Sequence, residues 1–86
     1  MMRIIRTDTF IANFEKLPEE VKRKTKQSIK FLADNLFHPS LRAKKVKGSR
    51  GIWEASVTMK YRFTFQIKTD TYILRKIGTH DILQNP

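Results

Sequence analysis

The chain has 86 residues, of which 18 are Lys or Arg and eight are Asp or Glu, so its formal net charge at pH 7 is +10. At this length we expect a single domain over residues 1–86, with a core drawn from the 40% of residues that are hydrophobic. The absence of Cys excludes disulfides, thiolate nucleophiles and Cys-based zinc sites, and makes the reducing cytoplasm the default location. A strongly cationic surface favours polyanionic partners: RNA, DNA, an anionic membrane or an acidic protein.

Apolar runs are short, and metal-ligating side chains are sparse. No apolar run exceeds three residues, so the sequence predicts neither a membrane span nor a secretory signal. There are two histidines, His38 and His80, and the acidic residues are scattered singly apart from Glu19 and Glu20. We therefore expect no membrane partner and no metal site.

The beginning of the chain predicts a strand followed by a helix. Residues 2–6 form a short segment rich in β-branched side chains, which favours a strand. Asp8 is the expected N-cap of a helix that carries Phe10, Phe14 and Leu17 at helical spacing.

A second helix is expected from Pro18, which can occupy the first helical position, to a point before Pro39. Its buried stripe is Val21, Thr25, Ser28, Ile29, Leu32 and Leu36. A basic ridge lies beside this stripe: Lys22, Lys26 and Lys30. The two helices form a hairpin whose apolar faces need a sheet or another helix to cover them.

The second half of the chain predicts a basic loop and a three-strand meander. The loop, residues 38–51, carries five cationic side chains and admits an irregular edge strand at residues 45–47. The strands of the meander are expected at residues 53–58, 61–68 and 72–77, and Gly78 ends the last one. The predicted fold class is α+β: an N-terminal strand, a helical hairpin and an antiparallel three-strand meander, with the helices on one face of the sheet.

Alternation along the meander predicts a polar face that is open to solvent. Because side chains alternate across a strand, the aromatic residues that pack on the helices turn the intervening polar residues to the other side. These are Glu54, Ser56, Arg62, Thr64 and Gln66. The basic loop and the segment after Gly78 would flank this face as a shallow groove. The residues alone also allow Arg62 to be a solvated cross-strand neighbour of Glu54 without a function.

Several short motifs accompany the predicted elements in chain order. They are Leu41, Lys45-Val46-Lys47-Gly48, Trp53, Tyr61-Arg62-Phe63-Thr64-Phe65-Gln66 and Ile77-Gly78-Thr79-His80-Asp81. Over nearly the whole chain, their order and spacing resemble the RelE/ParE superfamily of bacterial toxin–antitoxin toxins. The Gly-Thr-His-Asp ending and the earlier His-Pro pair are most similar to the ribosome-associated mRNA endonuclease branch that includes YafQ-like members.

The resemblance implies an endoribonuclease that enters the ribosomal A site, cuts mRNA and inhibits translation. A ribose 2′-OH would attack the adjacent phosphate, leaving a 2′,3′-cyclic phosphate and a 5′-OH, without a metal or cofactor. The reaction needs a base near the 2′-OH, cations around the developing phosphorane and an acid for the leaving 5′ oxygen.

The resemblance also assigns roles to individual residues. Arg62 matches the phosphate-binding arginine of the family, and its planar guanidinium can hold two phosphate oxygens at once. His80 matches the C-terminal histidine and would act as general acid or base. Lys45 and Lys47 match the basic stretch and would stabilise the scissile phosphate or nearby rRNA phosphates. Further candidates for RNA contact, or for orienting Arg62 and His80, are Arg42, Lys44, Arg50, Glu54 and Asp81.

The partners implied by the resemblance are a cognate antitoxin, the ribosome and its mRNA. The antitoxin would cover the cationic groove with an amphipathic or acidic segment, so the free toxin is expected to be a monomer and its complex a hetero-oligomer in the cytoplasm. Two other functions remain open: a ParE-like inhibitor of DNA gyrase, and a non-catalytic basic relative that binds nucleic acid. Arg62 and His80 on one groove would favour the nuclease.

Overall fold

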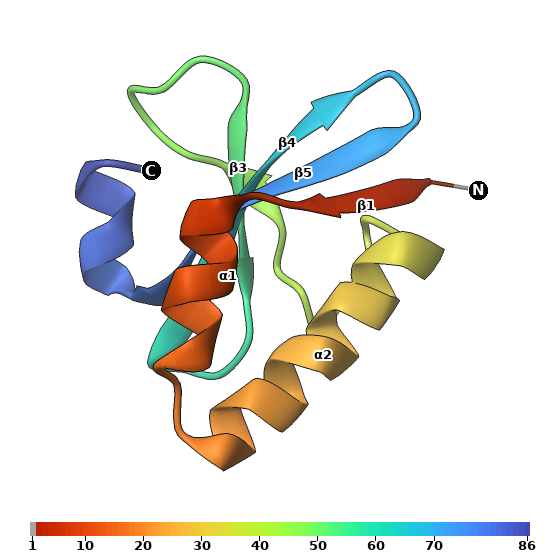
Figure 1. Ribbon diagram of the computed structural model, residues 1–86. Helices are drawn as coiled ribbons and strands as arrows, with labels where there is room; N and C mark the ends of the chain where they lie inside the picture. The colour runs from red at the N-terminus through yellow and green to blue at the C-terminus, as the bar shows by residue number, and fades with distance from the viewer. Residues whose placement is uncertain (1) are drawn as a thin grey trace.

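The computed structural model describes residues 2–86, which form a five-stranded sheet, two α-helices and a C-terminal 3₁₀ helix (Figure 1). The strands are β1 (Arg3–Arg6), β2 (Lys44–Lys45), β3 (Ile52–Ser56), β4 (Tyr61–Lys68) and β5 (Thr71–Thr79). The helices are α1 (Asp8–Glu15), α2 (Glu19–Asp34) and the 3₁₀ helix η1 (His80–Gln84). The predicted α+β class, with a strand, a helical hairpin and a meander, is confirmed.

The strand order in the sheet is β1-β5-β4-β3-β2. Strands β3, β4 and β5 form the expected antiparallel meander, and β1 adds to β5 as a parallel edge strand in which Arg3 lies opposite Thr71. A parallel pair requires a long crossover. Here the crossover consists of both helices and strands β2, β3 and β4, so the first and last strands of the chain lie side by side.

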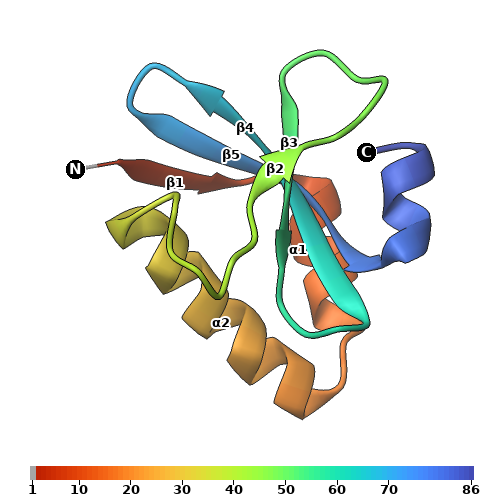
Figure 2. The same cartoon turned by 180° about the vertical axis from the view of Figure 1, so that it is seen from behind.

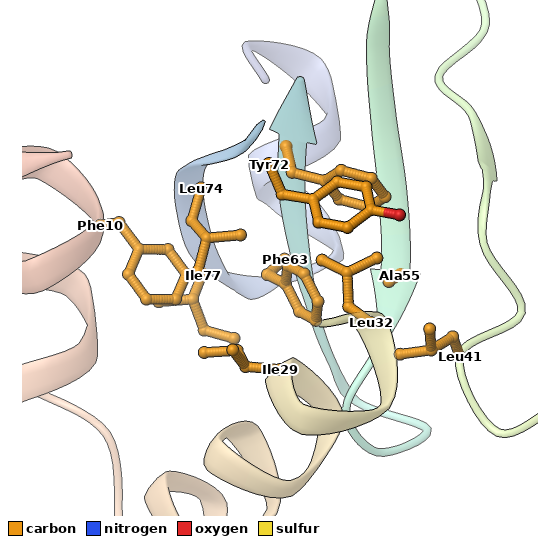
Figure 3. Packing of buried hydrophobic residues seen from close by; sticks show 10 residues of the cluster. Phe10, Ile29, Leu32, Leu41, Ala55, Phe63, Tyr72, Leu74 and Ile77 are labelled. Atoms are coloured by element: carbon orange, nitrogen blue, oxygen red, sulfur yellow. The ribbon is translucent and has the colours of Figure 1, made fainter. Parts of the chain in front are cut away.

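Both α-helices pack on the same face of the sheet, where the core forms (Figure 3). The buried apolar residues are Phe10, Ile29, Leu32, Leu41, Val46, Ala55, Phe63, Phe65, Tyr72, Leu74 and Ile77. Phe63 and Phe65 of β4 have no exposed surface, as the alternation predicts. The Tyr72 ring stands edge-on to Phe65 with 5.7 Å between the ring centroids, an arrangement that aromatic pairs favour.

The N-cap of α1 is Thr7, and the prediction of Asp8 is wrong by one residue. Thr7 Oγ1 accepts a hydrogen bond from the Phe10 backbone N–H at 3.2 Å, and its single proton lies within reach of the carbonyl oxygens of Leu74 (2.8 Å) and Arg75 (3.1 Å). A hydroxyl can cap the helix and donate to β5 at the same time, whereas an ionised carboxylate only accepts. Asp8 instead lies in the first turn, at the positive end of the helix dipole.

Helix α2 begins one residue later than predicted and ends, as predicted, before Pro39. Pro18 is its N-cap rather than its first helical residue, and the Pro18 carbonyl accepts the Lys22 N–H at 2.9 Å. The helix ends at Asp34, because Asn35 is extended and its Oδ1 accepts the Phe37 N–H at 3.0 Å. No helix within residues 2–86 is long and apolar enough to cross a membrane.

Strand β5 continues through Gly78, contrary to the prediction that this glycine ends it. Gly78 lies opposite Arg62 in the ladder, and pairing continues to Thr79. A Cβ atom at position 78 would lie 3.0 Å from Ile82 Cγ2. The missing side chain therefore lets η1 fold back closely against the end of β5.

Candidate functional site

Arg62 of β4 is held by two side chains of β3. Its Nη1 donates to Glu54 Oε1 at 3.3 Å and to Ser56 Oγ at 3.1 Å. Ser56 lies directly opposite Arg62 in the antiparallel register and Glu54 lies two residues further along, so all three side chains share one face of the sheet. The Glu54 side chain is 7% exposed and the Arg62 side chain 26%. The carboxylate is therefore enclosed, while part of the guanidinium faces solvent.

The prediction that the face carrying Arg62 is open to solvent is wrong for Glu54 and Thr64, whereas Ser56, Arg62 and Gln66 remain partly exposed. Thr64 has no exposed surface, and Glu54, counted as a whole residue, is 5% exposed. In Figures 1 and 2, η1 lies on the opposite side of β3 and β4 from α2. The C-terminal segment, residues 80–86, thus covers part of the polar face, and Thr64 Oγ1 donates to the Pro86 carbonyl at 3.3 Å.

A β-bulge helps to fix this C-terminal segment. Thr64 pairs with Lys76 and Phe65 with Leu74, which leaves Arg75 as the extra residue of β5. Arg75 Nε donates to the Pro86 carbonyl at 3.0 Å, and Lys76 Nζ donates to the Asn85 carbonyl. Two consecutive residues therefore reach the same segment. Regular alternation would have placed them on opposite faces, which is why the sequence pattern did not predict this contact.

His80 begins η1 directly after β5, and both it and the adjacent Asp81 are exposed. Because Gly78 is the ladder partner of Arg62, His80 lies two residues beyond that partner. The fold brings Arg62 and the His80 segment from adjacent strands to the same end of the sheet.

The lysines of β2 lie on different faces of the sheet. Lys44 pairs with Glu54, which places it on the face of Arg62. Lys45 pairs with Trp53 on the helix-covered face, and its Nζ lies 5.8 Å from the centroid of the Trp53 ring, within cation–π range. The edge strand expected at residues 45–47 forms at Lys44–Lys45. The other exposed cations of this segment are Arg42, Lys47 and Arg50.

A pocket of about 480 Å³ brings Arg42 and Arg62 together. It lies between the loop after α2 and the β3–β4 turn, and its remaining lining residues are Pro39, Ser40, Ser56, Val57, Thr58 and Met59. Of its hydroxyl-bearing residues, only Ser56 was expected on this face; Ser40 and Thr58 were not singled out from the sequence, because only the folded chain brings residues 39–42 beside residues 56–59. His80, Lys45 and Lys47 do not line this pocket.

The second histidine has a structural role. The His38 ring stacks on Phe31 with centroids 3.9 Å apart, and His38 Nδ1 accepts the Ser40 N–H at 3.1 Å. These contacts shape the loop that leads into the pocket. Within residues 2–86, no three His, Asp or Glu side chains gather where they could hold a metal ion.

No protein-family model matches this sequence, and no curated protein is similar enough to be a relative. Solved structures, in contrast, show that the fold is that of the RelE-like toxins. The chain matches one in the RelB–RelE antitoxin–toxin complex from Methanococcus jannaschii at 18% identity, over 94% of this chain and 95% of that one, with a TM-score of 0.76.

Two further structures have the same fold. YafQ from E. coli strain BL21(DE3) is 16% identical over 96% of this chain and 98% of that one, with a TM-score of 0.79. The YoeB/ParE toxin from Agrobacterium tumefaciens is 16% identical over 92% and 99%, with a TM-score of 0.78. At these identities the likeness establishes the fold alone.

Proposed function

We propose that this protein is the toxin of a toxin–antitoxin pair and that it cleaves mRNA on the ribosome. One observation carries the nuclease proposal. The enclosed Glu54 holds the Arg62 guanidinium, which is partly open to solvent, and this pair lies at the end of the sheet where His80 follows β5. The RelE-like fold and the net charge of +10 support a toxin that acts on an anionic polymer.

Arg62 binds the scissile phosphate in this proposal. Within residues 2–86 the only hydrogen bonds of its guanidinium are made by Nη1, which leaves Nε and Nη2 to donate to two phosphate oxygens. Negative charge on these oxygens grows as the 2′-OH attacks. A guanidinium already fixed by Glu54 and Ser56 stabilises that charge without having to reorganise.

His80 transfers a proton, either from the attacking 2′-OH or to the leaving 5′ oxygen. Such a group contributes a rate factor of about 10²–10⁴. Its exposure leaves the ring accessible to RNA, and Asp81 lies next to it in the first turn of η1.

The remaining cations contribute affinity. Lys44 shares the face of Arg62, whereas Lys45, Lys47 and Arg50 are exposed along the edge of the sheet or in the turn that follows. Contacts with mRNA and rRNA phosphates would make binding salt-dependent, because each neutralised phosphate releases counterions.

The test is primer extension on mRNA translated by purified ribosomes. Arg62→Lys keeps the charge that balances Glu54 but loses the planar fork, and His80→Ala removes the proton-transfer group. We expect each variant to lose cleavage by about 10²-fold or more. Arg3→Lys is the matched control, because Arg3 is exposed on β1, at the other edge of the sheet from β2.

Cleavage that persists in both variants would refute the assigned roles. A wild-type protein that leaves translated mRNA intact and blocks supercoiling by gyrase would instead support the ParE-like function. Circular dichroism of each variant separates loss of function from loss of fold.

The proposed antitoxin has a suitable surface. A second hollow of about 400 Å³ between α1 and α2 is lined by apolar side chains that include Ile11 and Phe14, and its charged lining residues are three cations, Arg6, Lys26 and Lys30, and one acid, Glu15. The excess of cations beside apolar side chains suits an acidic amphipathic segment. Chains of similar fold occur in complexes with RelB and with DinJ, which supports an antitoxin as the partner. Ile11→Glu should abolish co-purification with an antitoxin co-expressed from the same operon while mRNA cleavage persists, and retained binding would exclude this groove.

A further inference from the structure

We propose that the pocket shared by Arg42 and Arg62 is a subsite for one of the two nucleotides that flank the scissile phosphate. This inference rests on the proposed nuclease function and adds to it a binding site for a particular part of the substrate. The volume of about 480 Å³ falls within the roughly 300–1,000 Å³ of pockets that hold small organic ligands.

The charges around the pocket favour an anion. Arg42 and Arg62 both line it, and no acidic side chain does. Glu54 offsets part of the charge of Arg62 from the sheet side, but it does not reach the lining. No ion pair is formed by Arg42 within residues 2–86. Its guanidinium is thus available to a phosphate group.

Two hydroxyl groups in the lining of the pocket add hydrogen-bond donors. Ser56 Oγ accepts from Arg62 Nη1 at 3.1 Å, and Thr58 Oγ1 accepts the backbone N–H groups of Lys60 and Tyr61, each at 3.1 Å. Because both oxygens act as acceptors in these bonds, their own O–H groups remain to donate. Such donors match ribose hydroxyls, base carbonyls and phosphate oxygens.

The backbone holds Arg42 in place by an uncommon conformation. The preceding residue, Leu41, is fully buried, and its carbonyl accepts the Ser56 N–H at 2.7 Å, which ties the loop to the end of β3 (Figure 2). Arg42 then adopts φ of +48°, in the left-handed region that costs a non-glycine residue about 1 kcal/mol or more. The chain therefore turns sharply after the buried Leu41, and Arg42 lines the pocket from that turn.

An apolar contribution distinguishes a nucleotide site from a site for phosphate alone. Met59 lines the pocket and is 98% exposed, and the half-buried Val57 lies beside it. A thioether packs favourably against an aromatic ring. Cations and hydroxyls next to an apolar side chain fit a ligand that joins an anionic phosphate to a planar base.

The position of the pocket gives the substrate a path across the sheet. Ser56, Arg62 and Gly78 lie in one row across β3, β4 and β5, with the pocket on the β3 side of Arg62 and His80 following Gly78 on the β5 side. An RNA strand bound at Arg62 would therefore cross the ends of the strands. One flanking nucleotide would lie in the pocket and the other towards His80.

The test is an NMR titration of the full chain with three probes: a nucleoside 3′-monophosphate, the corresponding 5′-monophosphate and inorganic phosphate. We expect one or both nucleotides to shift the amide signals of residues 39–42 and 56–62. Preference for the 3′- or the 5′-isomer identifies which flanking nucleotide occupies the pocket. Arg42→Gln should weaken nucleotide binding about tenfold or more, the loss expected for a charged hydrogen bond, and Arg3→Gln should leave it unchanged.

Two results would overturn the inference: shifts confined to residues outside this pocket, or inorganic phosphate that binds as tightly as the nucleotides. Cleavage assays separate this failure from failure of the proposed function. If cleavage depends on Arg62 and His80 while Arg42→Gln leaves KM unchanged, the subsite is wrong and the nuclease stands. If nucleotides bind in the pocket but mRNA is never cut, the nuclease is wrong and the binding site stands.

Discussion

Arg62 Nη1 lies 3.3 Å from Glu54 Oε1 in an ion pair whose two members differ in exposure, 26% for the Arg62 side chain and 7% for that of Glu54. Water can solvate the arginine when its partner is removed, but it reaches the carboxylate poorly. Replacing Arg62 should therefore lower the stability of the protein more than replacing Glu54 does, although both changes break the same contact.

We predict that Arg62→Met lowers the free energy of unfolding by about 2–4 kcal/mol, because it leaves the enclosed Glu54 charge without a partner. Glu54→Gln should cost about 1 kcal/mol. The double variant should be more stable than the sum of the two losses implies, as measured by urea denaturation at pH 7. Equal and additive losses would show that the two side chains are not coupled.

The hydroxyl of Thr7 caps α1 and bonds β5, so Thr7→Ala should destabilise the protein by about 1–2 kcal/mol. Thr7→Ser retains the hydroxyl and should recover most of this loss. Asp8→Ala removes only a charge near the helix N-terminus, an effect of about 0.3–1 kcal/mol. Thermal or urea unfolding of the three variants checks the order, and a larger loss for Asp8→Ala than for Thr7→Ala would contradict the assigned cap.

Arg75 bonds the Pro86 carbonyl and the Gln66 side chain, so Arg75→Ala should loosen the segment that covers the polar face of the sheet. We expect amide hydrogen exchange in residues 80–86 to accelerate about tenfold, while the core of β4 stays protected. Arg23→Ala is the control, because Arg23 pairs with Glu20 on an exposed face of α2. Unchanged exchange in the C-terminal segment would show that these bonds do not hold it.

Burial raises the pKa of the Tyr72 hydroxyl above its usual value, since the ionised form is poorly solvated in the core. The unfolded chain therefore releases this proton at lower pH than the folded chain does. Stability is retained below the usual tyrosine pKa of about 10 and falls as the pH rises through the higher folded value.

Tyr72→Phe removes this titration, and we expect the variant to lose less stability than the wild type between pH 9 and pH 11. Tyr61→Phe is the control for general alkaline effects. The measurement is the midpoint of urea unfolding at each pH. Parallel curves for the wild type and Tyr72→Phe would refute the assignment.

The sequence by itself determined the sidedness of the main elements. A period of two in β4 places Phe63 and Phe65 on one face, and a helical period in α2 places Ile29 and Leu32 on one stripe, because backbone geometry fixes both repeats locally. The α+β class followed from these periods, and the residues that resembled RelE/ParE toxins led to the fold that the solved structures share.

The tertiary structure alone decided how these faces are used. The cover over Thr64, the pairing of Lys44 with Glu54 and the pocket that joins Arg42 to Arg62 all depend on contacts between distant segments. Such contacts follow from strand register, a bulge at Arg75 and a left-handed turn at Arg42. The period of two within a strand fixes which side chains share a face, but it does not specify where a bulge shifts the register or which distant segment covers that face.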